Sequence, residues 1–171
     1  MSEDHEEAGG AAHRNFGQTV LGWWRVNIGA RDSAQARALA ARLRRAGPVE
    51  ALSERSVQDL ARLVHAGPAR AEALARLVRL LAEIREHDSA PLARRLGDGV
   101  LSELRFQRLM RAEGDERDAL MRRAIAMADR SCNVAALASD LWRWDDATRT
   151  RWCFHYFGAE APVDAVRETT E

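Results

Sequence analysis

Apolar residues recur every three to four positions through nearly the whole chain, and this period constrains the fold more than any other feature. Such spacing places the apolar side chains on one face of an α-helix. No stretch alternates apolar and polar residues for long, as a half-buried strand would. Gly47-Pro48 and Gly67-Pro68 interrupt the pattern and mark helix ends. We therefore predict an all-α protein with about eight helices.

The length of the chain, 171 residues, suits one ordinary core or two small helical bundles packed together. We expect a boundary within residues 87–91 (HDSAP), where a long helical pattern ends in small polar residues and a proline. The predicted parts are an acidic disordered tail at 1–13, an N-terminal bundle at 14–88, a C-terminal bundle at 89–158 and a mobile tail at 159–171.

Each predicted helix is bounded by turn residues. The helices are expected at about 16–28, 33–46, 54–65, 69–87, 92–96, 102–112, 115–130, 134–144 and 146–157. Ser53 and Asp145 are predicted N-caps, because their side-chain oxygens can accept from the first free N–H groups of a helix. Arg79 and Glu83, four residues apart, are expected to face solvent.

The charge is distributed unevenly. All 26 basic residues are arginine, and residues 14–130 carry 22 of them against 15 acidic residues. The planar guanidinium grips phosphate through two parallel hydrogen bonds, so a basic middle favours a polyanionic partner. A GC-rich genome also favours arginine and alanine codons, so the clustering of arginine is more informative than its number.

Composition also bears on the class of protein and its location. Hydrophobic residues make up 46% of the chain, which excludes a disordered protein, and no apolar run is long enough to span a membrane. The acidic N-terminus lacks the order of a secretory signal. Cys132 and Cys153 have no metal-type spacing. We expect a cytoplasmic protein with reduced thiols and with no metal, cofactor or membrane partner.

A series of arginine and aromatic motifs runs from residue 92 to residue 158. It reads LxRxL at 92–96, RFxxLxRA at 105–112, LxRR at 120–123, LxxDLWxW at 137–144 and RxxWxxxYF at 149–157. Trp23-Trp24 and the segment RLRRAGPVE at 42–50 precede it. In order and spacing these motifs resemble the CasB family, the small helical subunit of the type I-E CRISPR surveillance complex Cascade.

The resemblance implies a non-enzymatic subunit. It would be present as two copies, contact other Cascade subunits and the hybrid of guide RNA with target DNA, and offer a basic surface to the displaced DNA strand. It would thereby stabilise the R-loop, the structure formed by that hybrid and the displaced strand. The nucleic-acid-binding candidates are Arg44, Arg45, Arg94, Arg105, Arg108, Arg111, Arg122 and Arg123.

Other interpretations remain open. The aromatic block at 142–157 could stack single-stranded bases, although its helical spacing favours packing in the core. Residues 53–85 could form a helix-turn-helix of a DNA-binding regulator, and the arginines could merely solubilise a protein–protein adaptor. Nothing resembles a catalytic set: Cys153 and His155, two apart on a helix, point to different faces.

Overall fold

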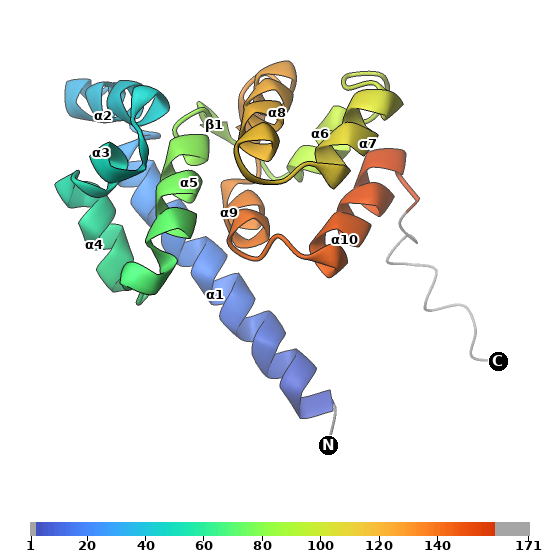
Figure 1. The fold of residues 1–171 in the computed structure, drawn as a ribbon, viewed down its shortest axis with the longest axis horizontal. Coiled ribbons are helices and arrows are strands. Elements are labelled where there is room, and N and C mark those ends of the chain that lie inside the picture. Colours follow the sequence, from blue (N-terminus) through green and yellow to red (C-terminus); the bar gives the residue numbers. More distant parts are fainter. Residues whose placement is uncertain (1–2, 160–171) are drawn as a thin grey trace.

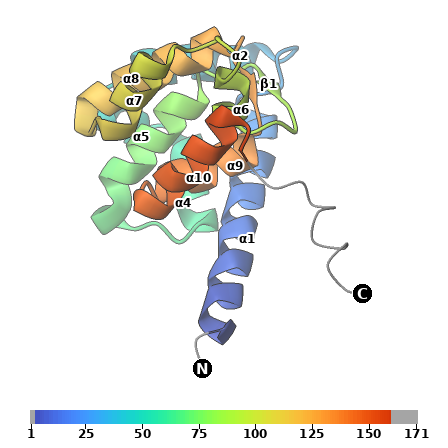
Figure 2. The same cartoon turned by 90° about the vertical axis from the view of Figure 1, so that its right-hand side faces the viewer.

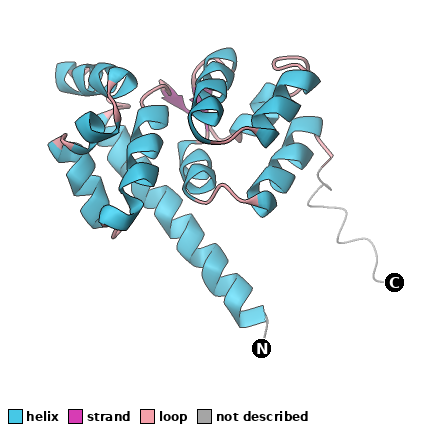
Figure 3. Cartoon of the chain, in the orientation of Figure 1, coloured by secondary structure: helices cyan, strands magenta, loops and turns pink. Residues whose placement is uncertain are grey.

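The computed structural model describes the backbone of residues 3–159 and the side chains of residues 15–159. Helices account for nearly all of its regular structure (Figure 3), which confirms the all-α prediction. The helices are α1 (Glu3–Asn27), α2 (Ala34–Arg45), α3 (Pro48–Leu52), α4 (Arg55–Leu63), α5 (Ala71–Leu81), α6 (Leu92–Leu96), α7 (Glu103–Arg111), α8 (Gly114–Met127), α9 (Val134–Trp142) and α10 (Asp146–Phe157). A 3-10 turn, η1 (Pro68–Arg70), and the strands β1 (Glu86–His87) and β2 (Ser131–Cys132) complete them.

The helices form two groups joined through the middle of the molecule. Helices α2 to α5 gather at one end, and α6, α7, α8 and α10 gather at the other (Figure 1). Helix α1, the first in the chain, packs mainly against α9, which lies between the two groups (Figure 1). The view turned by 90° shows α1 leaving the body of the molecule toward the N-terminus (Figure 2).

A glycine allows α1 and α9 to approach closely. A Cβ atom at Gly17 would lie 2.5 Å from the carbonyl oxygen of Ala135 and 2.6 Å from the Ser139 hydroxyl. Both distances are well below van der Waals contact, so any larger residue at position 17 would push the two helices apart.

One hydrophobic core continues across both groups. It includes Trp23 and Trp24 of α1, Leu77 of α5, Phe106 of α7 and Trp152 of α10. The indole nitrogen of Trp24 donates a hydrogen bond to the carbonyl oxygen of Leu81 at 3.1 Å, and the same oxygen accepts from the backbone N–H of Ile84, so Trp24 helps to satisfy the end of α5. The division into folding units at 14–88 and 89–158 stays a prediction.

A short parallel strand pair, absent from the sequence prediction, joins the two groups. Glu86 pairs with Ser131 and His87 with Cys132. The predicted helix at 69–87 is therefore too long, since α5 ends at Leu81. The physical reason is that the backbone beyond residue 84 bonds to the segment before α9 instead of continuing the helix.

Other element boundaries differ in smaller ways. Helix α1 begins at Glu3, inside the segment predicted as an acidic tail, whose disorder stays a prediction. Pro48 opens the unpredicted α3, because proline suits the first turn of a helix. The predicted cap Ser53 is wrong: it ends α3, and Glu54 precedes α4. The predicted tail from residue 160 onward lies outside the described residues.

Candidate nucleic-acid interface

Helix α7 presents arginines because of how its apolar residues are spaced. Ser102 caps the helix by accepting from the backbone N–H of Arg105 at 3.4 Å. Phe106 and Leu109, three residues apart, are buried. Arg105 and Arg108 consequently lie on the exposed side, as does Arg111 in the last turn, where a cation interacts favourably with the helix dipole.

A groove of about 380 Å³ lies between α7 and α8 and brings three predicted site residues together. Its apolar lining consists of Leu101, Leu109, Leu120, Ala126 and Met127. Its polar lining consists of Arg105, Arg108 and Arg123. The structure thus joins two motifs that are separate in the sequence, the helix at 105–112 and the LxRR segment at 120–123.

The charge of this groove is only partly neutralised by the protein. Arg108 forms an ion pair with Glu116, with its Nη2 2.8 Å from Oε1. Among the residues that the structure describes, the lining residues Arg105 and Arg123 make no side-chain ion pair or hydrogen bond, and neither does Arg111, which lies outside the lining at the end of α7. These exposed guanidinium groups keep all their donors available for an anionic ligand.

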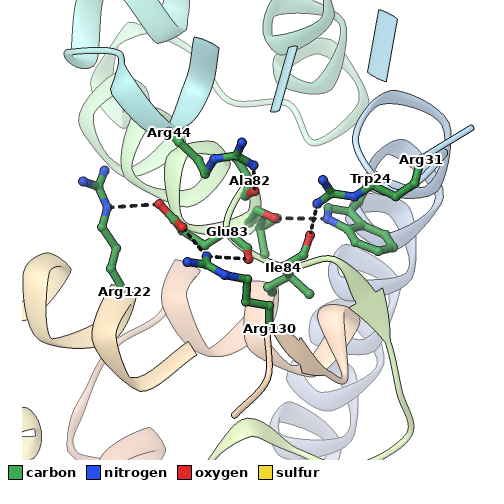
Figure 4. Close-up of polar contacts among 9 residues, drawn as sticks. Trp24, Arg31, Arg44, Ala82, Glu83, Ile84, Arg122 and Arg130 are labelled. Atoms are coloured by element: carbon green, nitrogen blue, oxygen red, sulfur yellow. Dashed lines mark hydrogen bonds and ion pairs between the residues drawn. The ribbon is translucent and has the colours of Figure 1, made fainter. Parts of the chain in front are cut away.

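The predicted site residues Arg44 and Arg122 lie elsewhere, at the C-terminal end of α5 (Figure 4). Arg44 donates to the carbonyl oxygen of Ala82 at 3.3 Å. Arg122 lies 3.9 Å from a carboxylate oxygen of Glu83. Both are half-buried, so they hold the fold together at this point, and nucleic-acid contacts by them stay a prediction.

Three members of this cluster, Arg130, Arg31 and Glu83, were not among the site residues predicted from the sequence. Arg130 donates to the Glu83 carboxylate at 2.7 Å and to its carbonyl oxygen at 3.3 Å. Arg31 donates to the carbonyl oxygen of Ile84 at 3.1 Å. Glu83 is itself buried, so the prediction that it faces solvent is wrong. Its partner Arg130 lies 47 residues away, beyond the reach of spacing rules.

The positively charged arginines of this cluster repel one another, and the pKa of Arg31 reflects that repulsion. Burial lowers the pKa of Arg31, and the positive charges of Arg44, Arg85 and Arg130 lower it further. Glu83 supplies the carboxylate that offsets this repulsion for Arg130 and Arg122.

The three remaining predicted site residues, Arg45, Arg94 and Arg111, lie outside the groove lining and outside the cluster at the end of α5. Arg45, in the last turn of α2, is exposed and has no polar partner among the described residues. Arg94 is exposed on α6. The eight predicted arginines therefore divide into three that line the groove, two in the cluster at the end of α5 and three at other positions.

The aromatic block mainly packs inside the protein. Trp152 is 2% exposed, and its indole nitrogen donates to the Asp140 carboxylate at 2.8 Å. Tyr156 is also buried, stacks on Phe106 and donates to the carbonyl oxygen of Leu101. These contacts favour the packing interpretation over a base-stacking platform.

Cys132 and Asp145 have structural surroundings. Burial raises the pKa of the Cys132 thiol to about 12, so this thiol stays protonated. Asp145 is the predicted N-cap, accepting from the N–H of Thr148 at 2.9 Å, and that bond lowers its pKa. The described residues contain no group of three or more His, Cys, Asp or Glu placed to hold a metal ion. No helix in the described part is long and apolar enough to cross a membrane.

The helix-turn-helix alternative requires α5 to expose a recognition face. Six of its residues are buried in the core instead: Leu74, Ala75, Leu77, Val78, Leu80 and Leu81. A helix packed in this way has little surface left to enter a DNA groove.

Comparisons with known proteins agree with the motifs. The family model described as CRISPR-associated protein Cse2 matches residues 38–157, more than two thirds of the chain, including α7, α8 and every member of the cluster at the end of α5 except Arg31. Comparisons with curated proteins and with solved structures gave no significant match. The chain belongs to the Cse2 family, the CasB small subunit of type I-E Cascade.

Proposed function

We propose that this Cascade subunit binds nucleic-acid backbone without sequence specificity and, having no catalytic role, stabilises the R-loop by holding the displaced DNA strand. It would act beside the hybrid of guide RNA with target DNA, together with a second copy of itself and other Cascade subunits. Base pairing with the guide supplies sequence recognition in RNA-guided complexes, so the protein needs only to recognise backbone.

The observation that carries the proposal is the arginine-lined groove between α7 and α8. Arg105 and Arg123 project from two different helices toward one groove, and neither has a polar partner among the described residues. Two rigid helices fix the spacing of the guanidinium groups, which reduces the entropy lost when phosphates bind.

Small contributions suffice for this role. R-loop formation exchanges one duplex for another of similar stability, so a few backbone contacts can shift the balance. Each contact to a single strand also releases condensed counterions, which makes the binding dependent on salt.

The direct test is binding of unstructured single-stranded DNA by the full chain across a range of salt concentrations. Arg105→Ala and Arg123→Ala should each reduce the magnitude of the log–log salt slope by roughly 0.7. The loss of affinity should be similar for unrelated sequences, because a phosphate contact carries no base information. Arg55→Ala is a matched control, since Arg55 is an exposed arginine of α4, at the other end of the molecule.

The outcomes separate the alternatives. Sequence-blind binding whose slope falls in both groove variants supports the proposal. An unchanged slope in folded groove variants removes the groove from the interface. Preference for one duplex sequence would favour a DNA-binding regulator, and absence of binding by both the isolated chain and the assembled complex would favour a protein–protein adaptor.

A further inference from the structure

We propose that the groove between α7 and α8 accommodates an unstacked base of the bound single strand, in addition to contacting its phosphates. This inference rests on the proposed function and adds to it, since a purely electrostatic surface would need no apolar floor. The ligand class is a single-stranded nucleotide of any sequence.

The chemistry of the groove lining is divided into two kinds. Its apolar floor is formed by Leu101, Leu109, Leu120, Ala126 and Met127, of which Met127 is 38% exposed. Its polar side chains are all arginines, which offer donors and no acceptor. A matching ligand needs an apolar face together with acceptor groups, and a nucleotide has both. Its base provides a flat apolar face, and its phosphate and base carbonyls accept from guanidinium groups.

The size of the groove suits one such unit. Its volume of about 380 Å³ lies at the lower end of the range of roughly 300–1,000 Å³ found for small-ligand sites. The guanidinium of Arg105 or Arg123 can lie flat on a base or grip a phosphate, as arginines do in single-strand recognition. An aliphatic floor has no directional groups, so it accepts every base.

An acidic amphipathic peptide is the other candidate occupant, and the lining disfavours it. An extended peptide in the groove would bury backbone N–H groups, and an N–H group without an acceptor is costly. The side chains that line the groove provide no acceptor oxygen. A nucleotide can leave its amino groups at the open side of the groove, in contact with water.

The test compares two oligonucleotides of equal length, oligo-dT and a fully abasic strand with the same number of phosphates. The full chain should bind oligo-dT more tightly by about fivefold, the factor that corresponds to roughly 1 kcal/mol. Ala126→Leu fills the groove from α8 and should abolish this preference while leaving the salt slope unchanged. Ala119→Leu is the matched control, because Ala119 is exposed on the same helix and lies outside the lining.

The results distinguish this inference from the proposed function. Equal binding of both strands by the unmodified chain overturns the base site and leaves backbone binding intact. A preference that persists in Ala126→Leu also overturns it, because the base must then lie elsewhere. Failure of both the isolated chain and the assembled complex to bind either strand at low salt overturns both proposals. Competition by a peptide of alternating Glu and Leu, without competition by oligo-dT, would assign the groove to a protein partner.

Discussion

The guanidinium of Arg70 lies over the indole ring of Trp142, 4.2 Å from the ring centroid, and its Nη2 donates to the Trp142 carbonyl oxygen at 2.9 Å. Phe16 stacks on the same indole, with ring centroids 4.9 Å apart. Trp142 of α9 is thereby held between α1 and the turn that precedes α5. The contact links three segments that are distant in the sequence.

Removal of that cation should weaken the link measurably. Arg70→Ala should lower the free energy of unfolding by about 0.5–1 kcal/mol, the usual contribution of an exposed cation–π contact. Denaturant unfolding measures the change. Arg45→Ala, another exposed arginine without a described polar partner, should change stability by less than about 0.5 kcal/mol. Equal effects in the two variants would show that the contact contributes nothing.

Truncation of Trp152 tests the packing interpretation of the aromatic block. Trp152→Ala should cost about 3–5 kcal/mol, because it leaves a large cavity at a residue only 2% exposed. Phe154→Ala, at 51% exposure on the same helix, should cost far less. Thermal unfolding gives the comparison. A Trp152 variant that melts normally and loses DNA binding would restore the base-stacking interpretation.

Replacement of Glu83 tests the cluster at the end of α5. Glu83→Gln removes the charged acceptor of Arg130 and should cost about 1.5–3 kcal/mol, the range for hydrogen bonds to charged groups. Glu86→Gln, an exposed position in β1, is the control and should be nearly neutral. If both variants unfold at the same denaturant concentration, the cluster is not stabilised by its carboxylate.

Charge reversal separates structural arginines from candidate ligand arginines. Arg44→Glu with Arg122→Glu should lower the melting temperature, because both side chains contact the end of α5. Arg45→Glu with Arg123→Glu should leave the melting temperature nearly unchanged and shorten R-loop lifetime in the assembled complex. Failure of the second pair to assemble into Cascade would assign those arginines to guide RNA or to neighbouring subunits.

His87 makes stability depend on pH. Its Nδ1 accepts from the N–H of Val134 at 3.2 Å, and burial, aided by the charge of Arg25, lowers its pKa from the ordinary 6.5. Because the pKa of His87 is lower in the folded state than in the unfolded state, the unfolded state binds the proton more tightly. Protonation of His87 therefore favours unfolding. Stability should be complete above about pH 6.5 and fall as the pH drops through that value. Melting temperatures across this range measure the effect.

The control is His87→Asn, which has no titratable group at this position and should flatten the pH dependence. Any slope that remains should come from His155, whose pKa burial also lowers. A slope unchanged in the variant would exclude His87 as its source.

The parts of the fold that follow local rules could be predicted from sequence. Phe106 and Leu109 on one face of α7 were enough to place Arg105 and Arg111 on the other. On α8, burial of Met121 and Ile125 separates the half-buried Arg122 from the exposed Arg123, a distinction that motif matching did not make.

The parts that depend on distant partners could not be predicted. The i,i+4 spacing of Arg79 and Glu83 suggested a solvent-exposed pair, yet Glu83 turns toward Arg130. The strand at Glu86–His87 exists only because Ser131–Cys132 lies beside it. Neither the groove nor the cluster at the end of α5 has a local sequence signal, because each forms between segments that meet only after folding.

The close packing of α1 on α9 has a consequence during synthesis. The surface of α9 that receives Gly17 is complete only when the ribosome has reached Trp142, more than a hundred residues after α1 ends. At roughly 5–20 residues per second, the apolar side of the first helix waits on the order of 6–23 s for its partner. Throughout that interval the nascent chain leaves this apolar surface uncovered by α9, and a translational pause before α9 would prolong the exposure.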